Sequence, residues 1–222
     1  MAKAYILPFV LYLLGTTIIS RFGDAWYPLS YSLLVGLVAG VAYCLLRGTH
    51  AIRPHMQIGH GIWIGLLGIG LWIGLSHLHL EQRLATLLPA WLSPDARVAY
   101  NPFEQLATPL AIWSFLAVRT VGLALLVPLV EEVFWRGFLL RWTIDPEWEK
   151  VPLGEYTWGS CMIVTAMFTL AHPEWLAAAV YCLLLNGLLY WKRDLWLCIV
   201  AHAVSNFALA IYVLWTESWW LW

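Results

Sequence analysis

Charged residues are scarce in this sequence: Asp, Glu, Lys and Arg make up 11% of its 222 residues, against about 25% in an ordinary soluble domain. Apolar residues make up 62%, so there is too little polar surface to cover a water-soluble globule. The near balance of 12 basic and 13 acidic residues excludes a strong basic field, and with it a nucleic-acid partner. The composition therefore predicts a protein that resides in a lipid bilayer.

Several chemical signatures are also missing. The sequence contains no His-Glu-x-x-His zinc motif, no Gly-x-Ser-x-Gly nucleophile turn and no Gly-x-Gly-Asp motif. It has only four cysteines, none in a Cys-x-x-Cys pair, and all lie within apolar runs, as expected of small apolar side chains rather than of a disulfide or metal site. These are Cys44, Cys161, Cys182 and Cys198.

What the sequence does contain is a series of apolar runs of the length that a membrane-spanning helix requires, about 20 residues. Seven runs are found, at residues 4–19, 29–46, 61–76, 106–130, 158–171, 175–191 and 195–215. The amphipathic stretch 78–92, with Glu81, Gln82 and Arg83 on its polar side, is either an interfacial helix or an eighth span. The sequence predicts an all-α, polytopic bundle of seven to eight transmembrane helices in one membrane domain.

The basic residues between these runs predict the orientation, because cytoplasmic loops are enriched in Lys and Arg. With a cytoplasmic N-terminus, the inner side carries seven of them and the outer side three. The inner residues are Lys3, Arg47, Arg53, Arg141, Lys150, Lys192 and Arg193; the outer ones are Arg21, Arg83 and Arg97. Arg119 lies within the fourth run. Its side chain is expected either to form an ion pair or to extend to the membrane–water interface, and the sequence indicates no partner for it.

Ionisable groups inside a membrane are costly, so each is a functional candidate. The first group is Glu131 and Glu132, followed by Arg136, in a helix expected to continue to Trp142. Glu132 and Arg136 are four residues apart, which favours an ion pair on one helix face. Glu131 points about 100° away and has no partner in this segment. Such a carboxylate suits a general base or a proton carrier, although a surface ion pair at a helix end remains the alternative.

Two further helices each carry a pair of residues four positions apart, which places both members of the pair on one helix face. Phe168 precedes His172 by four residues, and Pro173 predicts that His172 lies at a helix end. His202 and Asn206 lie well inside the last run and share one face. Taken singly, His172 is also typical of an interfacial residue, and His202 with Asn206 of interhelical hydrogen bonding.

If the three helices converge, they provide a carboxylate, two imidazoles and an amide around one wet cavity. A carboxylate with one histidine can deprotonate water, and a histidine with an amide can stabilise an oxyanion. This set is sufficient for peptide hydrolysis. It requires that the short fifth helix end in the middle of the membrane, so that His172 reaches the depth of Glu131.

The ordered motifs Glu131-Glu132-x-x-x-Arg136, Phe168-x-x-x-His172 and His202-x-x-x-Asn206 resemble those of the CAAX protease and bacteriocin-processing family, which includes the type II CAAX prenyl endopeptidases. The approach to the last motif, from Gly187 to Trp196, is also similar. The resemblance covers residues 106–215, so residues 106–222 are expected to form the catalytic core. Residues 1–105 carry no family motif.

The resemblance implies an intramembrane endopeptidase whose active site opens toward the cytosol, acting on a membrane-anchored protein or peptide. It implies that Glu131 and His172 activate the attacking water, that His202 and Asn206 form the oxyanion site, and that Glu132, Arg136 and Phe168 support them. A metal-free mechanism is preferred. Zinc held by Glu131, His172 and His202 is the alternative.

Two other functions remain open from the residues. Membrane Glu and His also occur in proton-coupled transporters, although no inverted repeat relates the two halves of this chain. A non-catalytic membrane partner, such as an immunity protein, would keep the fold without the chemistry. The expected location is the plasma (inner) membrane, with the N-terminus in the cytoplasm.

Overall fold

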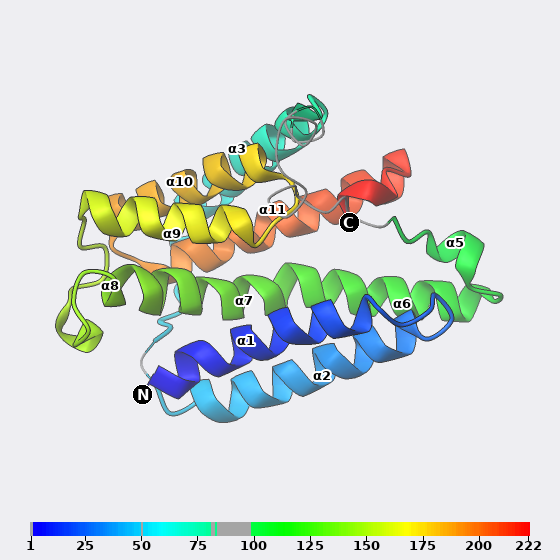
Figure 1. Cartoon of the computed structure of the whole chain (residues 1–222), viewed down its shortest axis with the longest axis horizontal. Helices are drawn as coiled ribbons and strands as arrows, with labels where there is room; N and C mark the ends of the chain where they lie inside the picture. Colours follow the sequence, from blue (N-terminus) through cyan, green and yellow to red (C-terminus); the bar gives the residue numbers. More distant parts are fainter. Residues whose placement is uncertain (1, 50, 81–82, 84–98) are drawn as a thin grey trace.

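The computed structural model describes residues 2–49, 51–80, 83 and 99–222. Within these ranges every regular element is helical. The helices are α1 (Ala2–Ile19), α2 (Tyr27–Leu46), α3 (Gly59–Ser76), α5 (Pro102–Gln105), α6 (Pro109–Val121), α7 (Val127–Glu132), α8 (Leu140–Trp142), α9 (Trp158–Leu170), α10 (Trp175–Lys192) and α11 (Leu195–Thr216). Figure 1 shows the longer ones running side by side as a bundle.

Among the described residues, six helical segments are long and apolar enough to cross a membrane: α1, α2, α3, the 34-residue run Pro109–Trp142, α10 and α11. The all-α polytopic fold is therefore confirmed, and the chain is an integral membrane protein. All seven predicted runs contain a helix, although the fourth begins at Pro109, after the cap of Thr108, rather than at residue 106. The predicted stretch 78–92 lies largely outside the described residues.

The seventh apolar helix, α9, is shorter than the others. Thr157 caps its start by accepting a hydrogen bond from the Ser160 amide at 3.1 Å. Its 13 residues span about 20 Å at 1.5 Å per residue, less than the roughly 30 Å of bilayer hydrocarbon. α9 is therefore too short to cross the hydrocarbon on its own.

The long run from α6 to α8 is continuous, but two π-helical segments interrupt its α-helical pattern, at Gly122–Leu126 and Val133–Leu139. Pro128 lacks an amide proton and so cannot complete an ordinary ladder here. The Val127 amide donates to the Gly122 carbonyl, five residues back. This leaves the Leu123 carbonyl, its usual partner, available for another donor.

The N-terminal helices pack against both sides of the later ones. α1 pairs with α2 and lies along the long helical run (Figure 1), whereas α3 packs against α10 and α11. The approach of α3 to α11 depends on glycine, because a Cβ atom on Gly65 would lie 2.5 Å from the Ala201 carbonyl oxygen. Residues 1–105 are thus in contact with the segment that carries the motifs.

Candidate active site

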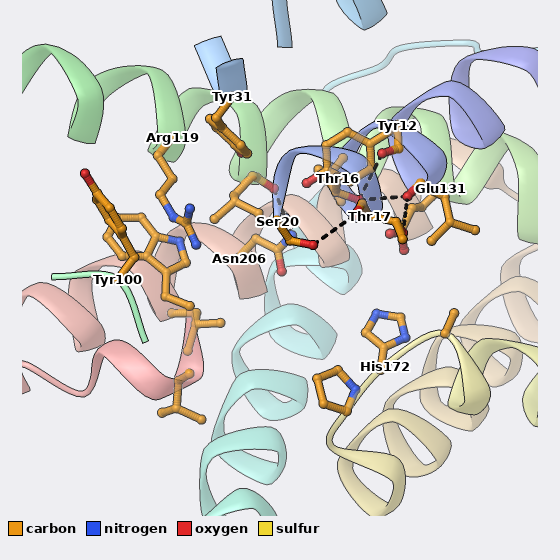
Figure 2. Close-up of a pocket in the computed structure, with 18 of the residues that line it drawn as sticks. Tyr12, Thr16, Thr17, Ser20, Tyr31, Tyr100, Arg119, Glu131, His172 and Asn206 are labelled. Atoms are coloured by element: carbon orange, nitrogen blue, oxygen red, sulfur yellow. Dashed lines mark hydrogen bonds between the residues drawn. The ribbon is translucent and has the colours of Figure 1, made fainter. Parts of the chain in front are cut away.

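A cavity of about 850 Å³ lies inside the bundle. Its walls come from α1, the start of α2, α3, the long helical run, the α9–α10 connection and α11. Glu131, His172, His202 and Asn206 all line it. The structure therefore brings the four expected catalytic residues to one cavity, and Figure 2 shows Glu131 and His172 on facing sides of it.

Glu131 is nearly buried, with 7% of its surface exposed. Its Oε2 atom is buried and has no hydrogen-bond partner among the described residues. A buried carboxylate oxygen without a partner is costly unless water or a ligand meets it. Glu131 is thus placed to accept a proton from something inside the cavity.

His172 follows the end of α9, as Pro173 predicted. Its Nδ1–H donates to the Phe168 carbonyl at 2.8 Å, because a carbonyl oxygen can only accept. In the neutral ring Nε2 is then the basic nitrogen. The Phe168 ring stacks on the imidazole at 4.4 Å between centroids, and Trp72 meets it edge-on at 5.7 Å.

Glu132 and Arg136 form the predicted ion pair, with Arg136 Nη1 donating to Glu132 Oε1 at 3.2 Å, and both side chains are fully buried. The other donors of Arg136 are also used: Nε donates to Asn186 Oδ1 at 3.1 Å, and Nη2 to the Cys182 carbonyl at 3.2 Å. The guanidinium carbon lies 5.1 Å from the centre of the Phe168 ring. This network connects the long helix to α10 and supports the ring that stacks on His172, although the buried Glu132 Oε2 atom has no hydrogen-bond partner among the described residues.

His202 joins the same network, a contact that the sequence did not predict. Its Nδ1–H donates to Glu132 Oε1 at 2.8 Å, and the side chain is almost fully buried. Behind the ring, the Tyr181 hydroxyl donates to Ser205 Oγ at 2.9 Å, and Ser205 lies 2.8 Å from the Gly65 carbonyl. These contacts fix the His202 face of α11 against α3 and α10.

Asn206 uses the carbonyl that the π-helical segment leaves available. Its Nδ2 donates to the Leu123 carbonyl at 2.8 Å. The amide has a second N–H and a carbonyl oxygen for other partners. The Gly122–Leu126 segment thereby ties Asn206 to the long helix, which carries Glu131 two turns further along.

The fit of a metal ion is poor. Among the residues that the structure describes, no group of three or more His, Cys, Asp or Glu side chains is arranged to hold one. Glu131, His172 and His202 therefore do not form a ready three-ligand zinc set. Glu132 engages the Nδ1–H of His202, so Nε2 is the ring atom left to meet a ligand.

Other cavity residues have no counterpart in the motifs. Arg119 lines the cavity beyond Asn206, and its partner is the hydroxyl of Tyr27, to which Nη1 donates. Tyr12 and Trp72 also line it, from helices in the region without family motifs. The only signal in the sequence was the charge of Arg119 within an apolar run, since its aromatic surroundings come from distant segments.

The cysteines also differ in part from expectation. Cys161, Cys182 and Cys198 are buried, but Cys44 is exposed on α2, and none of the four is in a disulfide.

Comparison with known proteins agrees with the motifs. Residues 112–208 match the family model described as Type II CAAX prenyl endopeptidase Rce1-like. No curated protein and no solved structure matches the chain. The matched segment contains all three ordered motifs and the four residues that meet at the cavity. This segment is less than half of the chain, and its similarity to the type II CAAX prenyl endopeptidases supports the resemblance of the motifs to the CAAX protease and bacteriocin-processing family.

Proposed function

We propose that this protein is an intramembrane endopeptidase that hydrolyses a peptide bond in or near a membrane-anchored protein or peptide. The observation that carries the proposal is the buried, unpartnered Oε2 atom of Glu131 in a cavity that His172 also lines. The family match supports proteolysis in general. The roles of the individual residues are part of the same proposal, supported by the cavity that the four side chains line.

In the first step Glu131 takes a proton from a water molecule that His172 orients through Nε2. The water oxygen attacks the carbonyl carbon of the scissile bond, and the carbonyl electron pair becomes an oxyanion. When this intermediate collapses, the C–N bond breaks. The proton held by Glu131 passes to the leaving nitrogen, which gives a carboxyl product and an amine product.

His202 and Asn206 stabilise the oxyanion in this proposal. Asn206 offers the N–H that does not bond to Leu123. His202 donates through Nδ1 to Glu132, so Nε2 can donate only when the ring carries a second proton. Glu132 lies beside that positive ring and compensates its charge.

The proposed mechanism needs no metal, because Glu131 and His172 together can deprotonate water. A divalent ion such as zinc is the alternative, for which the cavity lacks a ready three-ligand set. Turnover that persists after purification with a chelator supports the metal-free mechanism. Turnover that is lost with the chelator and returns with zinc contradicts it.

The shape of the cavity suits a substrate held in the bilayer. Thr17 and Ser20 near the end of α1 line the cavity and are exposed, and the α9–α10 connection forms the facing wall. A segment anchored in the membrane can therefore enter between these elements. The lipid bilayer and a membrane-anchored protein or peptide are the proposed partners, with no role for nucleic acid.

The loop charges support a cytoplasmic N-terminus. We place the protein in the plasma (inner) membrane with a cytoplasmic N-terminus. The cavity lies toward the end of the bundle where α1 ends and α6 begins, opposite the N-terminus (Figure 1). The charge-based orientation then turns the cavity away from the cytosol, whereas the family resemblance implies an opening toward it. These two expectations cannot both hold.

Cysteine labelling decides between them. Ser20→Cys near the cavity and Glu149→Cys in the loop after α8 are made separately in a Cys44→Ala background. A membrane-impermeant maleimide applied to intact cells is expected to label position 20 and not position 149. The reverse pattern contradicts the charge-based orientation and leaves the proteolytic proposal untouched.

The proposed activity is tested by mapping protein termini in membranes from cells that express the wild type, Glu131→Gln or Glu155→Gln. Glu155 is an exposed loop residue and serves as the matched control. New termini are expected with the wild type and the control, and none with Glu131→Gln. Identical termini in all three, at equal abundance, contradict the proposal. Lost flux without new termini indicates a transporter, and a tolerated Glu131→Gln indicates a non-catalytic partner.

A further inference from the structure

Arg119 is a buried cation that the hydrolytic mechanism does not use. It belongs to α6 and has 9% of its surface exposed, in a segment that crosses the membrane. A guanidinium carries five N–H donors, yet one side-chain hydrogen bond is found, to the Tyr27 hydroxyl. Among the described residues no carboxylate forms an ion pair with it. Asp24 also lines the cavity but is exposed.

Aromatic rings surround this guanidinium. Its carbon lies 5.1 Å from the ring centre of Trp222, 5.4 Å from that of Tyr31 and 5.6 Å from that of Tyr27. Such rings stabilise a cation without neutralising it or satisfying its N–H groups in the plane of the guanidinium. The positive charge is therefore kept at this place without a counter-ion from the described chain.

Other donors at the same end of the cavity also lack acceptors. The Tyr100 hydroxyl and the Trp222 indole Nε1 are buried, with no hydrogen-bond partner among the described residues. Both side chains line the cavity together with Arg119. Figure 2 shows the Arg119 guanidinium directed toward the cavity, with Tyr100 beside it. Buried polar groups are nearly always paired with protein or with ordered water, so donors gathered here without an acceptor leave room for a ligand or water to supply one.

The distance to the catalytic centre is set by the helix. Arg119 and Glu131 lie on one continuous helical run and line the same cavity. Their 12-residue separation corresponds to about 18 Å along the axis. An extended peptide advances about 3.3 Å per residue, so about five or six residues bridge the two groups.

We infer that Arg119, with Tyr100 and Trp222, forms a subsite for a carboxylate of the substrate, about five or six residues from the scissile bond. The carboxylate comes either from a free C-terminus or from an acidic side chain, and both present the same planar oxygen pair to the guanidinium. The inference rests on the proposed function for the meaning of the spacing. Carboxylate binding itself can be measured without turnover.

The test uses the full chain carrying Glu131→Gln, in lipid nanodiscs, so that no probe is cleaved. The probes are an acetylated six-residue peptide of Ala, Leu and Val with a free C-terminal carboxylate, the same peptide as its amide, and an amide with Glu as its last residue. Calorimetric Kd values are corrected for partition into empty nanodiscs. The free acid is expected to bind at least about 10-fold more tightly than the plain amide. A ratio near one for both acidic probes overturns the inference.

Comparison of the two acidic probes identifies the source of the carboxylate. Tighter binding of the free acid indicates a C-terminus, and tighter binding of the Glu-containing amide indicates an internal acidic residue. Either result supports the subsite.

Substitution then assigns the preference to Arg119. Arg119→Gln, added to Glu131→Gln, is expected to abolish it, and Arg119→Lys to reduce it, because Lys keeps the charge but not the two-pronged geometry. Arg21→Gln, an exposed cation on the same side, is expected to change nothing. A preference that survives Arg119→Gln overturns the inference. If Arg119→Gln does not fold, the Lys variant decides, since an unchanged ratio there excludes a guanidinium-specific site.

Proteolysis and carboxylate binding have separate readouts. An intact preference with no new termini in cells rejects the proposed function alone. New termini with no preference rejects the subsite alone.

Discussion

Glu131 and Glu132 are adjacent in the chain and have opposite surroundings. The Oε1 atom of the fully buried Glu132 is bonded to both Arg136 and His202. Each carboxylate has a buried Oε2 atom without a hydrogen-bond partner among the described residues, but of the two only Glu131 lines the cavity. The helix turns about 100° per residue, so consecutive side chains enter different environments. The comparison teaches that one helical turn can hold both a buried network, which positions other groups, and a carboxylate that lines a cavity, which is free to react.

The largest expected effect comes from Glu131, the carboxylate that lines the cavity. Glu131→Gln is expected to lower single-turnover cleavage by about 10²- to 10⁴-fold without a change in melting temperature. His172→Ala is expected to do the same. Because the two act on one water molecule, the double variant is expected to lose little more than either single variant. Fully additive losses indicate that the residues act in separate steps.

Breaking the network around Glu132 is expected to lower the stability of the fold rather than the rate of the cleavage step. Arg136→Ala leaves Glu132 buried beside only His202, so we expect a loss of about 3–5 kcal/mol in the free energy of unfolding. Chemical denaturation in detergent and abundance in membranes measure it. Arg47→Ala, at an exposed helix end, is the matched control. Equal stability of the two variants means that the network is not structural.

The close packing of α3 against α11, the helix that carries His202, is tested by substituting a glycine at their contact. Gly65→Ala places a Cβ atom against the Ala201 carbonyl, so we expect a loss of about 1–3 kcal/mol from overpacking. Gly70→Ala, on the same helix, meets nothing within 4 Å and is the control. Thermal unfolding in nanodiscs separates the two. A tolerated Gly65→Ala argues against the close approach of the helices.

The smallest expected effect comes from Ser205, whose hydrogen bonds help to fix the helix face that carries His202. Ser205→Ala removes the acceptor of the Tyr181 hydroxyl and the contact with the Gly65 carbonyl. The expected cost is about 0.5–1.5 kcal/mol in unfolding free energy. Tyr181→Phe alone and the double variant are expected to lie close to this value, because the three groups form one chain. Losses that add for Ser205 and Tyr181 contradict a shared hydrogen bond.

The sequence predicted the features that depend on local spacing. All seven predicted apolar runs contain a helix, because the length of an apolar run is a property of consecutive residues. The Glu132–Arg136 pair followed from four-residue spacing and is confirmed. The end of α9 before His172 followed from Pro173.

The contacts that were missed join distant segments. His202 and Glu132 are 70 residues apart, and Asn206 and Leu123 are 83 apart. The second contact also depends on a π-helical segment, whose only traces in the sequence are Gly122 and Pro128. Likewise, nothing in the spacing near Arg119 indicated that α2 and the last residues of the chain would supply its aromatic surroundings.

The shortness of α9 has a consequence for the lipid around the protein. A helix of 13 residues cannot match a bilayer of ordinary thickness, so lipid acyl chains beside the α9–α10 connection must shorten, tilt or give way to water. A thick membrane, rich in sterol or in lipids with long acyl chains, opposes that local thinning. Its hydrocarbon then covers the entrance of the cavity. We therefore expect the proposed cleavage to depend on acyl-chain length and to be fastest in thin bilayers, so that membrane thickness would itself regulate the proposed activity.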